Sequence, residues 1–326
     1  MLKFIISYLI FLPILLTGRQ VVTNSQFCKA TPDAEMSLNG KYLLYRNKKE
    51  SLKIIDIERN AVVAQLGNWG GPSGKFLYPV PLSSNIDNPL FYLLDCGDIF
   101  EVSENFKVSK TKQRLYSFEY DFGGNSSQWA SNYYIFNSRS LLFVGAEKRI
   151  EAGLFLTYSD LNGLITKKIL SLAVDTLKGY APYSGSLTIS YDKKKAIFAY
   201  NSYDAIRVID LEHKTSFLVQ RQLRNPGIST LRGSYKKHFR YYIKSAAGYK
   251  YFYCLYFGNS ADRLFSGKQI NSFIEQYNWD GSLVKIYKLD HVGLSFSINK
   301  AEDKLLLLSV AKSGLSAIYE YDVNAI

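Results

Sequence analysis

Cysteine and proline are scarce in this chain of 326 residues, and each shortage excludes a class of protein. Three cysteines, Cys28, Cys96 and Cys254, are too few and too scattered for a disulfide framework, and no C-x-x-C pair exists. Eight prolines and 22 glycines exclude collagen-like and low-complexity chains. Cys96 and Cys254 lie in strand-like apolar runs, which favours buried thiols. The alternative is that two of the three cysteines form one disulfide.

The sequence also lacks an apolar run long enough to cross a bilayer as a helix, which takes about 20 residues. The run at residues 4–16 is shorter, contains Pro13 and has the length of a signal-peptide core. We therefore predict a signal peptide over 1–18, whose end could fall as late as Ser25, and a single domain over 19–326. The alternative is that the run forms a buried first strand or helix of the domain.

The predicted leader implies export, either to the periplasm or to the cell surface. A lipid anchor would need a cysteine directly after the apolar core, and Cys28 lies well beyond Gly18. We therefore expect a monomeric mature chain without a lipid anchor or a transmembrane segment. The formal net charge of +12 would suit nucleic acid, but the leader and the acidic residues spread through the chain disfavour that partner.

Short apolar runs recur at a spacing of about fifty residues, which is typical of propeller repeats. The runs begin at Lys41, Leu90, Leu141, Ala196, Tyr251 and Leu305. An alternating segment that ends in an acidic or asparagine turn follows each run, and further strand candidates flank each pair. Four strands per unit, repeated six times, predict an all-β protein: a six-bladed β-propeller of four-stranded antiparallel blades. Seven blades stay open if residues 105–140 contain an extra partial unit.

The last predicted unit lacks an outer strand, because the chain ends soon after the segment AIYEYDV. The segment VVTNSQF at 21–27 has the composition of a strand and lies at the other end of the domain. We predict that this N-terminal strand completes the last blade and covers an edge that would otherwise invite aggregation.

Several stretches resemble one family, the TolB-like six-bladed propeller proteins exported by Bacteroidetes. Residues 273–298 are similar to its pattern of an aliphatic strand, a W-D-G turn and K-x-Y-x-L-D, and residues 249–258 are similar to its Y-x-Y-x-L-Y-x-G segment. Residues 185–212 resemble its strand–turn–strand unit with a lysine-rich turn. Residues 70–77 resemble its G-x-G-P-x-E-F loop, with an extra residue and with Lys75 where glutamate is expected.

The resemblance covers most of 36–326, and it implies a propeller fold and export. It implies no catalytic residues, because the family has no generally assigned activity.

Motifs for catalysis are missing from the sequence. There is no G-x-S-x-G elbow and no P-loop, and His213, His238 and His291 stand apart from one another. Several aspartates end the second strands of the units, where we expect them to cap their own turns: Asp56, Asp160, Asp210, Asp280 and Asp322. We predict no catalytic residue and no cofactor. A divalent metal in the central channel stays open, because such a site draws single residues from several blades.

The best binding candidate is the basic, aromatic stretch SYKKHFRYYIK at 234–244. Cations and flat rings together suit glycans, lipid headgroups or acidic protein surfaces. The candidate contact residues are Lys236, Lys237, His238, Arg240, Tyr241 and Tyr242. The alternative is an ordinary strand pair whose charges face water.

These observations favour an exported, non-catalytic binding or scaffold propeller that engages a protein or glycan partner through its loop face. The alternative is a metal-dependent enzyme, similar to propeller hydrolases and lactonases, with its site in the central channel. The missing motifs favour the first hypothesis.

Overall fold

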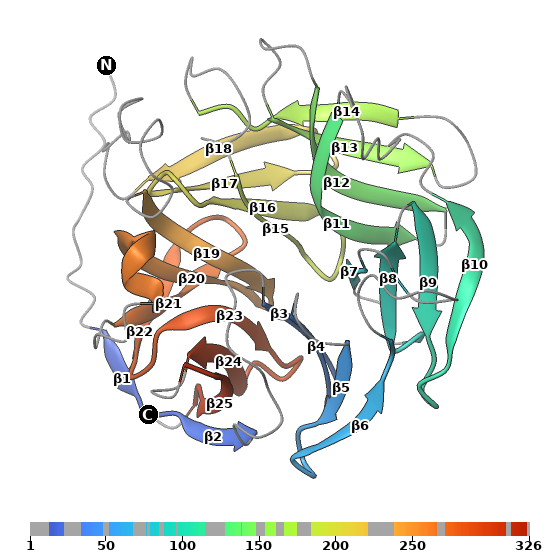
Figure 1. Ribbon diagram of the computed structural model, residues 1–326. Coiled ribbons are helices and arrows are strands. Elements are labelled where there is room, and N and C mark those ends of the chain that lie inside the picture. Colours follow the sequence, from blue (N-terminus) through green and yellow to red (C-terminus); the bar gives the residue numbers. More distant parts are fainter. Residues whose placement is uncertain are drawn as a thin grey trace, which may run out of the picture.

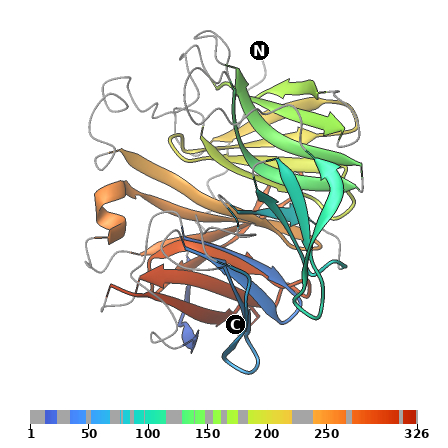
Figure 2. The same cartoon turned by 45° about the vertical axis from the view of Figure 1, so that its right-hand side comes forward.

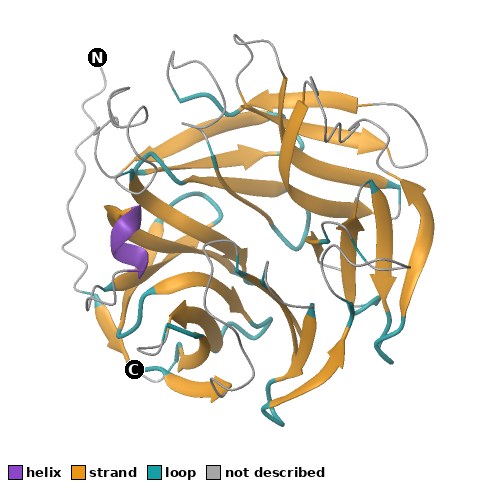
Figure 3. Ribbon diagram, viewed as in Figure 1, coloured by secondary structure: helices purple, strands orange, loops and turns teal. Residues whose placement is uncertain are grey.

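The computed structural model describes most of the strands and turns of the chain. The described residues are 13–22, 34–47, 52–67, 76, 79–84, 88–95, 97–114, 128–137, 139–147, 154–160, 166–174, 184–220, 238–265, 271–310 and 314–324. They form β-strands, apart from turns and one short 3₁₀ helix, η4 (Ala261–Phe265) (Figure 3). The prediction of an all-β protein is confirmed.

The strands form antiparallel sheets in which neighbours along the chain pair with one another. The first sheet contains β3 (Glu35–Asn39), β4 (Tyr42–Arg46), β5 (Lys53–Asp56) and β6 (Ala61–Gln65). A later one contains β15 (Gly185–Ile189), β16 (Lys195–Tyr200), β17 (Ala205–Asp210) and β18 (Thr215–Gln220). In the turned view the yellow and green strands lie above the orange, red and blue ones (Figure 2).

Two such four-stranded meanders join into one eight-stranded sheet, because their first strands, β7 and β11, pair in parallel. The first contains β7 (Val80–Ser84), β8 (Phe91–Asp95), β9 (Asp98–Val102) and β10 (Val108–Arg114). The second contains β11 (Gln128–Asn137), β12 (Ser140–Glu147), β13 (Leu154–Asp160) and β14 (Thr166–Ser171). The described residues between 105 and 140 belong to these two meanders, so the described chain shows no extra unit there.

The N-terminal segment adds a strand to each of the last two sheets, and Figure 1 shows it in blue beside the orange and red C-terminal strands. β1 (Ile14–Leu16) pairs in parallel with β22, the last strand of β19 (Phe239–Ala247), β20 (Tyr251–Ser260), β21 (Ser272–Asn278) and β22 (Leu283–Leu289). β2 (Arg19–Val22) pairs antiparallel with β25, beside β23 (Gly293–Ile298), β24 (Lys304–Val310) and β25 (Ser316–Asp322).

The predicted N-terminal strand therefore does become the fourth strand of the last sheet. It begins at Arg19, two residues before the predicted segment 21–27, and residues 23–27 lie outside the described part of the chain. The strand β1 falls inside the apolar run that we assigned to the leader. The leader over 1–18 stays a prediction.

The first strands of successive meanders gather at the centre of the molecule (Figure 1). Contacts link β7 to β11, β11 to β15, β15 to β19, β19 to β23, and β23 back to β3. Each of these strands therefore presents some of its side chains to one central space.

The apolar core lies between neighbouring sheets, so the middle strands are buried on both faces. In β24 the run Leu305–Leu308 is buried throughout, and β16 is buried from Ala196 to Tyr200. Strands covered on both sides read as continuous apolar runs, which explains why the repeat was visible in the sequence. The outer strand β18 alternates instead, and Phe217 is half exposed.

The polar residues that punctuate the strands behave as predicted where they are described. Asp56, Asp210 and Asp280 each accept backbone N–H hydrogen bonds from the turn that follows. Cys254 is a fully buried thiol in β20, whereas Cys28 and Cys96 lie outside the described residues.

Candidate functional site

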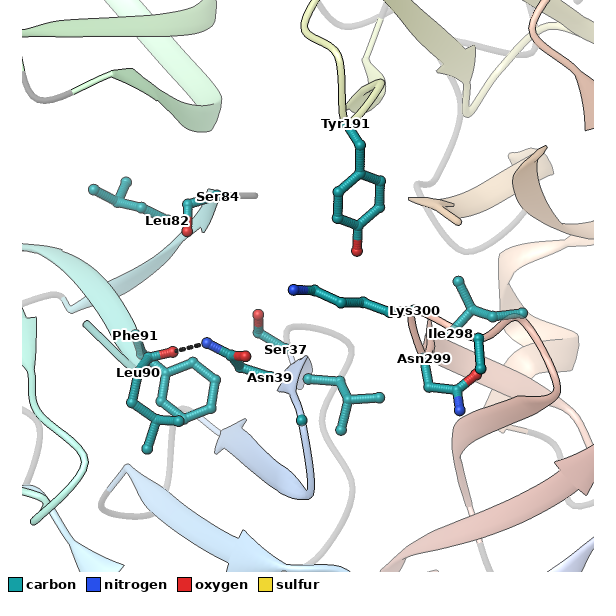
Figure 4. Close-up of a pocket in the computed structure, with 13 residues that line it drawn as sticks. Ser37, Asn39, Leu82, Ser84, Leu90, Phe91, Tyr191, Ile298, Asn299 and Lys300 are labelled. Carbon is teal, nitrogen blue, oxygen red and sulfur yellow. Dashed lines mark hydrogen bonds between the residues drawn. The ribbon is translucent and has the colours of Figure 1, made fainter. Parts of the chain in front are cut away.

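A central cavity of about 130 Å³ lies between the first strands of the meanders. It is lined by residues of β3, β7, β11, β15, β19 and β23. At the ends of β3, β15 and β23 the cavity widens into a pocket of about 300 Å³, which we call the mouth. The polar side chains of the mouth are Ser37, Asn39, Ser84, Tyr191, Asn299 and Lys300 (Figure 4).

Two of these side chains occupy equivalent positions in two turns of the same geometry. In the turn after β15, the N–H of Ser190 donates to the carbonyl of Lys195 at 2.9 Å, and Lys193 has a φ of 59°. In the turn after β23, the N–H of Asn299 donates to the carbonyl of Lys304 at 3.0 Å.

Glu302, with a φ of 60°, takes the place of Lys193 in that second turn. Tyr191 and Lys300 are therefore both the second residue of their turn, at the rim of the central space.

Side chains hold both turns in shape. The Ser190 hydroxyl accepts from the Lys195 N–H at 3.0 Å, and the Asn299 side-chain amide oxygen accepts from the Lys304 N–H at 3.1 Å. The hydrogen bond from Ser190 holds the pKa of Asp192 below its usual range, despite its partial burial. These side-chain-to-backbone bonds fix the position of the next residue in each turn.

The Glu302 carboxylate reaches back to β20 rather than into the mouth. It accepts a hydrogen bond from the Tyr253 hydroxyl at 2.8 Å. Burial and this carboxylate together raise the pKa of Tyr253 far above its usual value, so the hydroxyl keeps its proton. The contact ties the second turn to the neighbouring sheet.

Deeper in the cavity, charges of both signs are present. Lys244 of β19 and Glu35 of β3 line the cavity. The Glu35 carboxylate lies 3.9 Å from the Arg46 guanidinium, and Arg46 also donates to the carbonyl of Pro79 at 3.2 Å. Because Arg46 offsets Glu35, the balance of charge over cavity and mouth is positive.

Three buried hydroxyls on the wall of the cavity bind one another. The hydroxyls of Thr188 and Ser245 lie 2.7 Å apart, and the Ser245 hydroxyl lies 2.9 Å from that of Ser186. The N–H of Ser245 donates to Ser186 at 3.0 Å. This network joins β15 to β19 and places no histidine beside a hydroxyl, so it does not have the arrangement of an activated nucleophile.

The described lining does not fit a divalent cation. Calcium takes six to eight oxygen ligands, commonly from several carboxylates. Among the described residues that line the cavity and the mouth, one is acidic. This residue, Glu35, faces Arg46. No group of three or more histidine, cysteine, aspartate or glutamate residues is present in the described part of the chain.

The last residue of the basic aromatic stretch, Lys244, lines the cavity, whereas the rest of the stretch lies towards the other end of β19. His238 precedes β19, and Phe239 and Arg240 begin it, at the opposite end from the Ala247 that lines the cavity. Phe239 is half exposed, with its ring 6.0 Å from that of Tyr241.

The Tyr241 ring is in turn 6.5 Å from that of Tyr256, so three rings form a row at this end of the sheet. Tyr242 points into the core instead, where its hydroxyl donates to Glu275 at 3.2 Å. Lys236 and Lys237 lie outside the described residues.

Sequence reasoning missed the residues of the mouth. Tyr191 and Lys300 belong to different repeats and share no local motif, whereas Lys244 of the cavity wall ends the stretch 234–244 that the sequence had marked as a binding candidate. The shared feature is a serine or asparagine directly after the first strand, Ser190 or Asn299, which precedes Tyr191 and Lys300, and by itself it does not mark a cavity residue.

The fold resembles solved structures over nearly its whole length, whereas no protein-family model and no curated protein matches the sequence. A member of the DUF4221 family from Bacteroides vulgatus ATCC 8482 is 13% identical, with a TM-score of 0.60 over 96% of this chain and 97% of that one. A calcium-binding protein, regucalcin, from Agrobacterium tumefaciens C58 is 12% identical, with a TM-score of 0.57 over 95% of each chain.

A candidate exported protein of Bacteroides fragilis NCTC 9343 is 11% identical, with a TM-score of 0.52 over 94% of each chain. These similarities show that the chain has a β-propeller-type fold, and at this identity they show the fold alone. No helix in the described part of the chain is long and apolar enough to cross a membrane.

Proposed function

We propose that this protein is a non-catalytic binding propeller that holds part of a glycan or protein partner in the mouth of its central cavity. The observation that carries the proposal is the convergence of hydroxyl, amide and ammonium groups from several sheets on one pocket (Figure 4). Concave pockets with a few convergent polar groups are the usual form of a ligand site.

The enzyme alternative has less support. A lactonase-like site in the channel would need several oxygen ligands for a metal, and the described lining offers one carboxylate beside an arginine. The name of the regucalcin neighbour describes calcium binding by that protein, and the twelve per cent identity does not extend this property to the present chain.

We also propose that the meanders form six blades, with β2 closing the last one, and that the protein belongs with the TolB-like propellers. The parallel pairing of β7 with β11 and the contacts from β23 to β3 support a closed ring. The apolar run at 4–16 and the exported neighbour support secretion to the periplasm or the cell surface. A monomer suits a ring that closes within one chain.

A second contact surface remains part of the proposal. The row of Phe239, Tyr241 and Tyr256 rings, with Arg240 and His238 beside it, offers flat faces next to cations. Because it lies at the far end of β19 from the cavity, it would contact a different part of a partner.

The test is a binding screen with a variant whose mouth is filled. We expect the purified mature protein to bind members of a glycan and peptide array, and Ser37→Trp to abolish that signal by occupying the mouth. The matched control, Ser109→Trp, adds the same bulk to an exposed position on the outer strand β10 and should bind as the wild type does. Equal binding by Ser37→Trp would refute the proposal, as would turnover of a bound glycan.

A further inference from the structure

We infer that the mouth selects an anionic saccharide, with Lys300 binding its carboxylate and Tyr191, Ser37 and Asn39 binding its hydroxyls; this inference rests on the proposed function. A sugar acid such as a uronate, free or at the end of a glycan, combines those two features.

The cation of the mouth is held in place by the fold. Figure 4 shows the Lys300 ammonium group extending between Tyr191 and Ser37. Its backbone belongs to the turn at 299–304, which is closed by hydrogen bonds between Asn299 and Lys304. A lysine on a fixed backbone loses less freedom on binding than a lysine on a mobile loop.

Acidic side chains of the same turns are directed away from the mouth. Glu302 accepts from the Tyr253 hydroxyl, and Asp303 accepts from the Asn299 amide at 2.6 Å. In the equivalent turn, Asp192 accepts from the Ser190 hydroxyl at 2.6 Å. None of the described residues that line the mouth is acidic, and this favours an anion over a cation there.

The remaining groups suit hydroxyls. The Asn39 amide nitrogen donates to the carbonyl of Leu90 at 2.8 Å, which fixes this side chain at the edge of the mouth (Figure 4). The hydroxyls of Ser37 and Tyr191 can each donate and accept. Such groups can hydrogen-bond the hydroxyls of a sugar ring.

Size and depth agree with a ligand of one or two sugar units. The mouth, at about 300 Å³, is at the small end of the range for ligand pockets. Below the mouth the cavity narrows, and Lys244 lines it. A second anionic group further along a glycan would therefore lie near the Lys244 ammonium group.

The experiment is calorimetric titration of the full mature protein with sodium glucuronate, its neutral methyl ester, glucose and succinate. We expect glucuronate to bind at least about tenfold more tightly than the methyl ester or glucose, since a charge-assisted hydrogen bond is about twice as strong as a neutral one. Lys300→Gln should remove that difference and leave glucose unchanged. Lys112→Gln, which removes the same charge from an exposed position on β10, should bind as the wild type does.

Each other outcome overturns the inference in a recognisable way. Equal binding of glucuronate and its ester would refute the anion preference while leaving the proposed glycan function intact. Binding of succinate as tightly as glucuronate would refute the saccharide component. Binding of none of the four, with a positive array signal in the screen above, would refute the inference alone, whereas a negative array as well would refute the proposed function too. A uronate oligomer that binds more tightly than glucuronate would identify the end of a glycan as the source.

Discussion

Tyr241 and Tyr242 are adjacent in sequence and both pack against the Tyr256 ring, yet they differ in burial. Tyr242 is 1% exposed and donates to the fully buried carboxylate of Glu275, to which Tyr277 also donates. Tyr241 is half buried in the aromatic row at the end of β19. The pairing of β19 with β20 is irregular on both sides of Tyr242, so the stretch contains a core residue between partly exposed ones.

We predict that Tyr242→Phe lowers the free energy of unfolding by about 1–3 kcal/mol, because it removes a hydrogen bond to a buried charged group. Urea denaturation measures this value. Tyr249→Phe is the matched control, because Tyr249 is 74% exposed, and it should change stability by less than about 0.5 kcal/mol, as surface substitutions do. Equal effects of the two substitutions would contradict the burial of Tyr242.

His213 provides a prediction about pH. Its Nδ1 lies 3.0 Å from an Asp210 carboxylate oxygen in an exposed turn, and this hydrogen bond raises the pKa of His213 above its ordinary 6.5. The protonated form is therefore favoured in the folded chain. Its stabilising contribution is fully present below pH 6.5 and is lost as the pH rises through the raised pKa.

An NMR titration should show the His213 midpoint above 6.5, and Asp210→Asn should return it towards 6.5. His213→Gln assigns the resonance among the three histidines of the chain. An unchanged midpoint in Asp210→Asn would show that the pair does not form in solution.

At the scale of elements, the N-terminal segment is the feature that the sequence described least well. The run at 4–16 fits a signal-peptide core, and the same apolar pattern lets Ile14–Leu16 pair with β22. Gly18 follows, and its N–H lies 3.2 Å from both carboxylate oxygens of Asp290. A Cβ there would lie 2.6 Å from the Tyr321 ring, so the close approach requires glycine.

We predict that β2 contributes more to stability than β1. A chain that starts at Arg19 keeps the pairing with β25 and the buried Val21, whose burial alone is worth about 1.5–3 kcal/mol. A chain that lacks residues 1–30 loses both and leaves β25 as an open edge. Thermal unfolding with light scattering should show a clearly lower melting temperature and aggregation for the shorter chain. Equal melting temperatures would argue against β2 as the closing strand.

The elements themselves were predictable for a physical reason. Middle strands such as β16 and β24 are covered on both faces and therefore read as apolar runs, and aspartates such as Asp56 and Asp210 mark the turns by capping them. The cavity left no such mark. Its polar residues come singly from separate repeats, and equivalent turn positions hold residues as unlike as Tyr191 and Lys300.

At the scale of the whole molecule, the proposed function depends on the side chains that the first strands of the meanders bring to the central cavity. Segments near residues 37, 191, 244 and 300 are far apart in the chain and meet at one cavity. Propeller scaffolds host both enzymes and binding proteins, so the chemistry of this lining has to distinguish them. Here it presents lysines, hydroxyls and amides, with Glu35 facing Arg46.

This lining leads to a prediction about metal removal. A structural or catalytic divalent ion would stabilise the native state by mass action, so its removal would lower the melting temperature. Because the described lining does not fit such an ion, we expect EDTA to leave the thermal unfolding curve of the mature protein unchanged, and added calcium to have no effect. Elemental analysis of the untreated protein is the control and should show no stoichiometric metal. A melting temperature that falls in EDTA and recovers with calcium would favour the metal-dependent enzyme over the binding propeller.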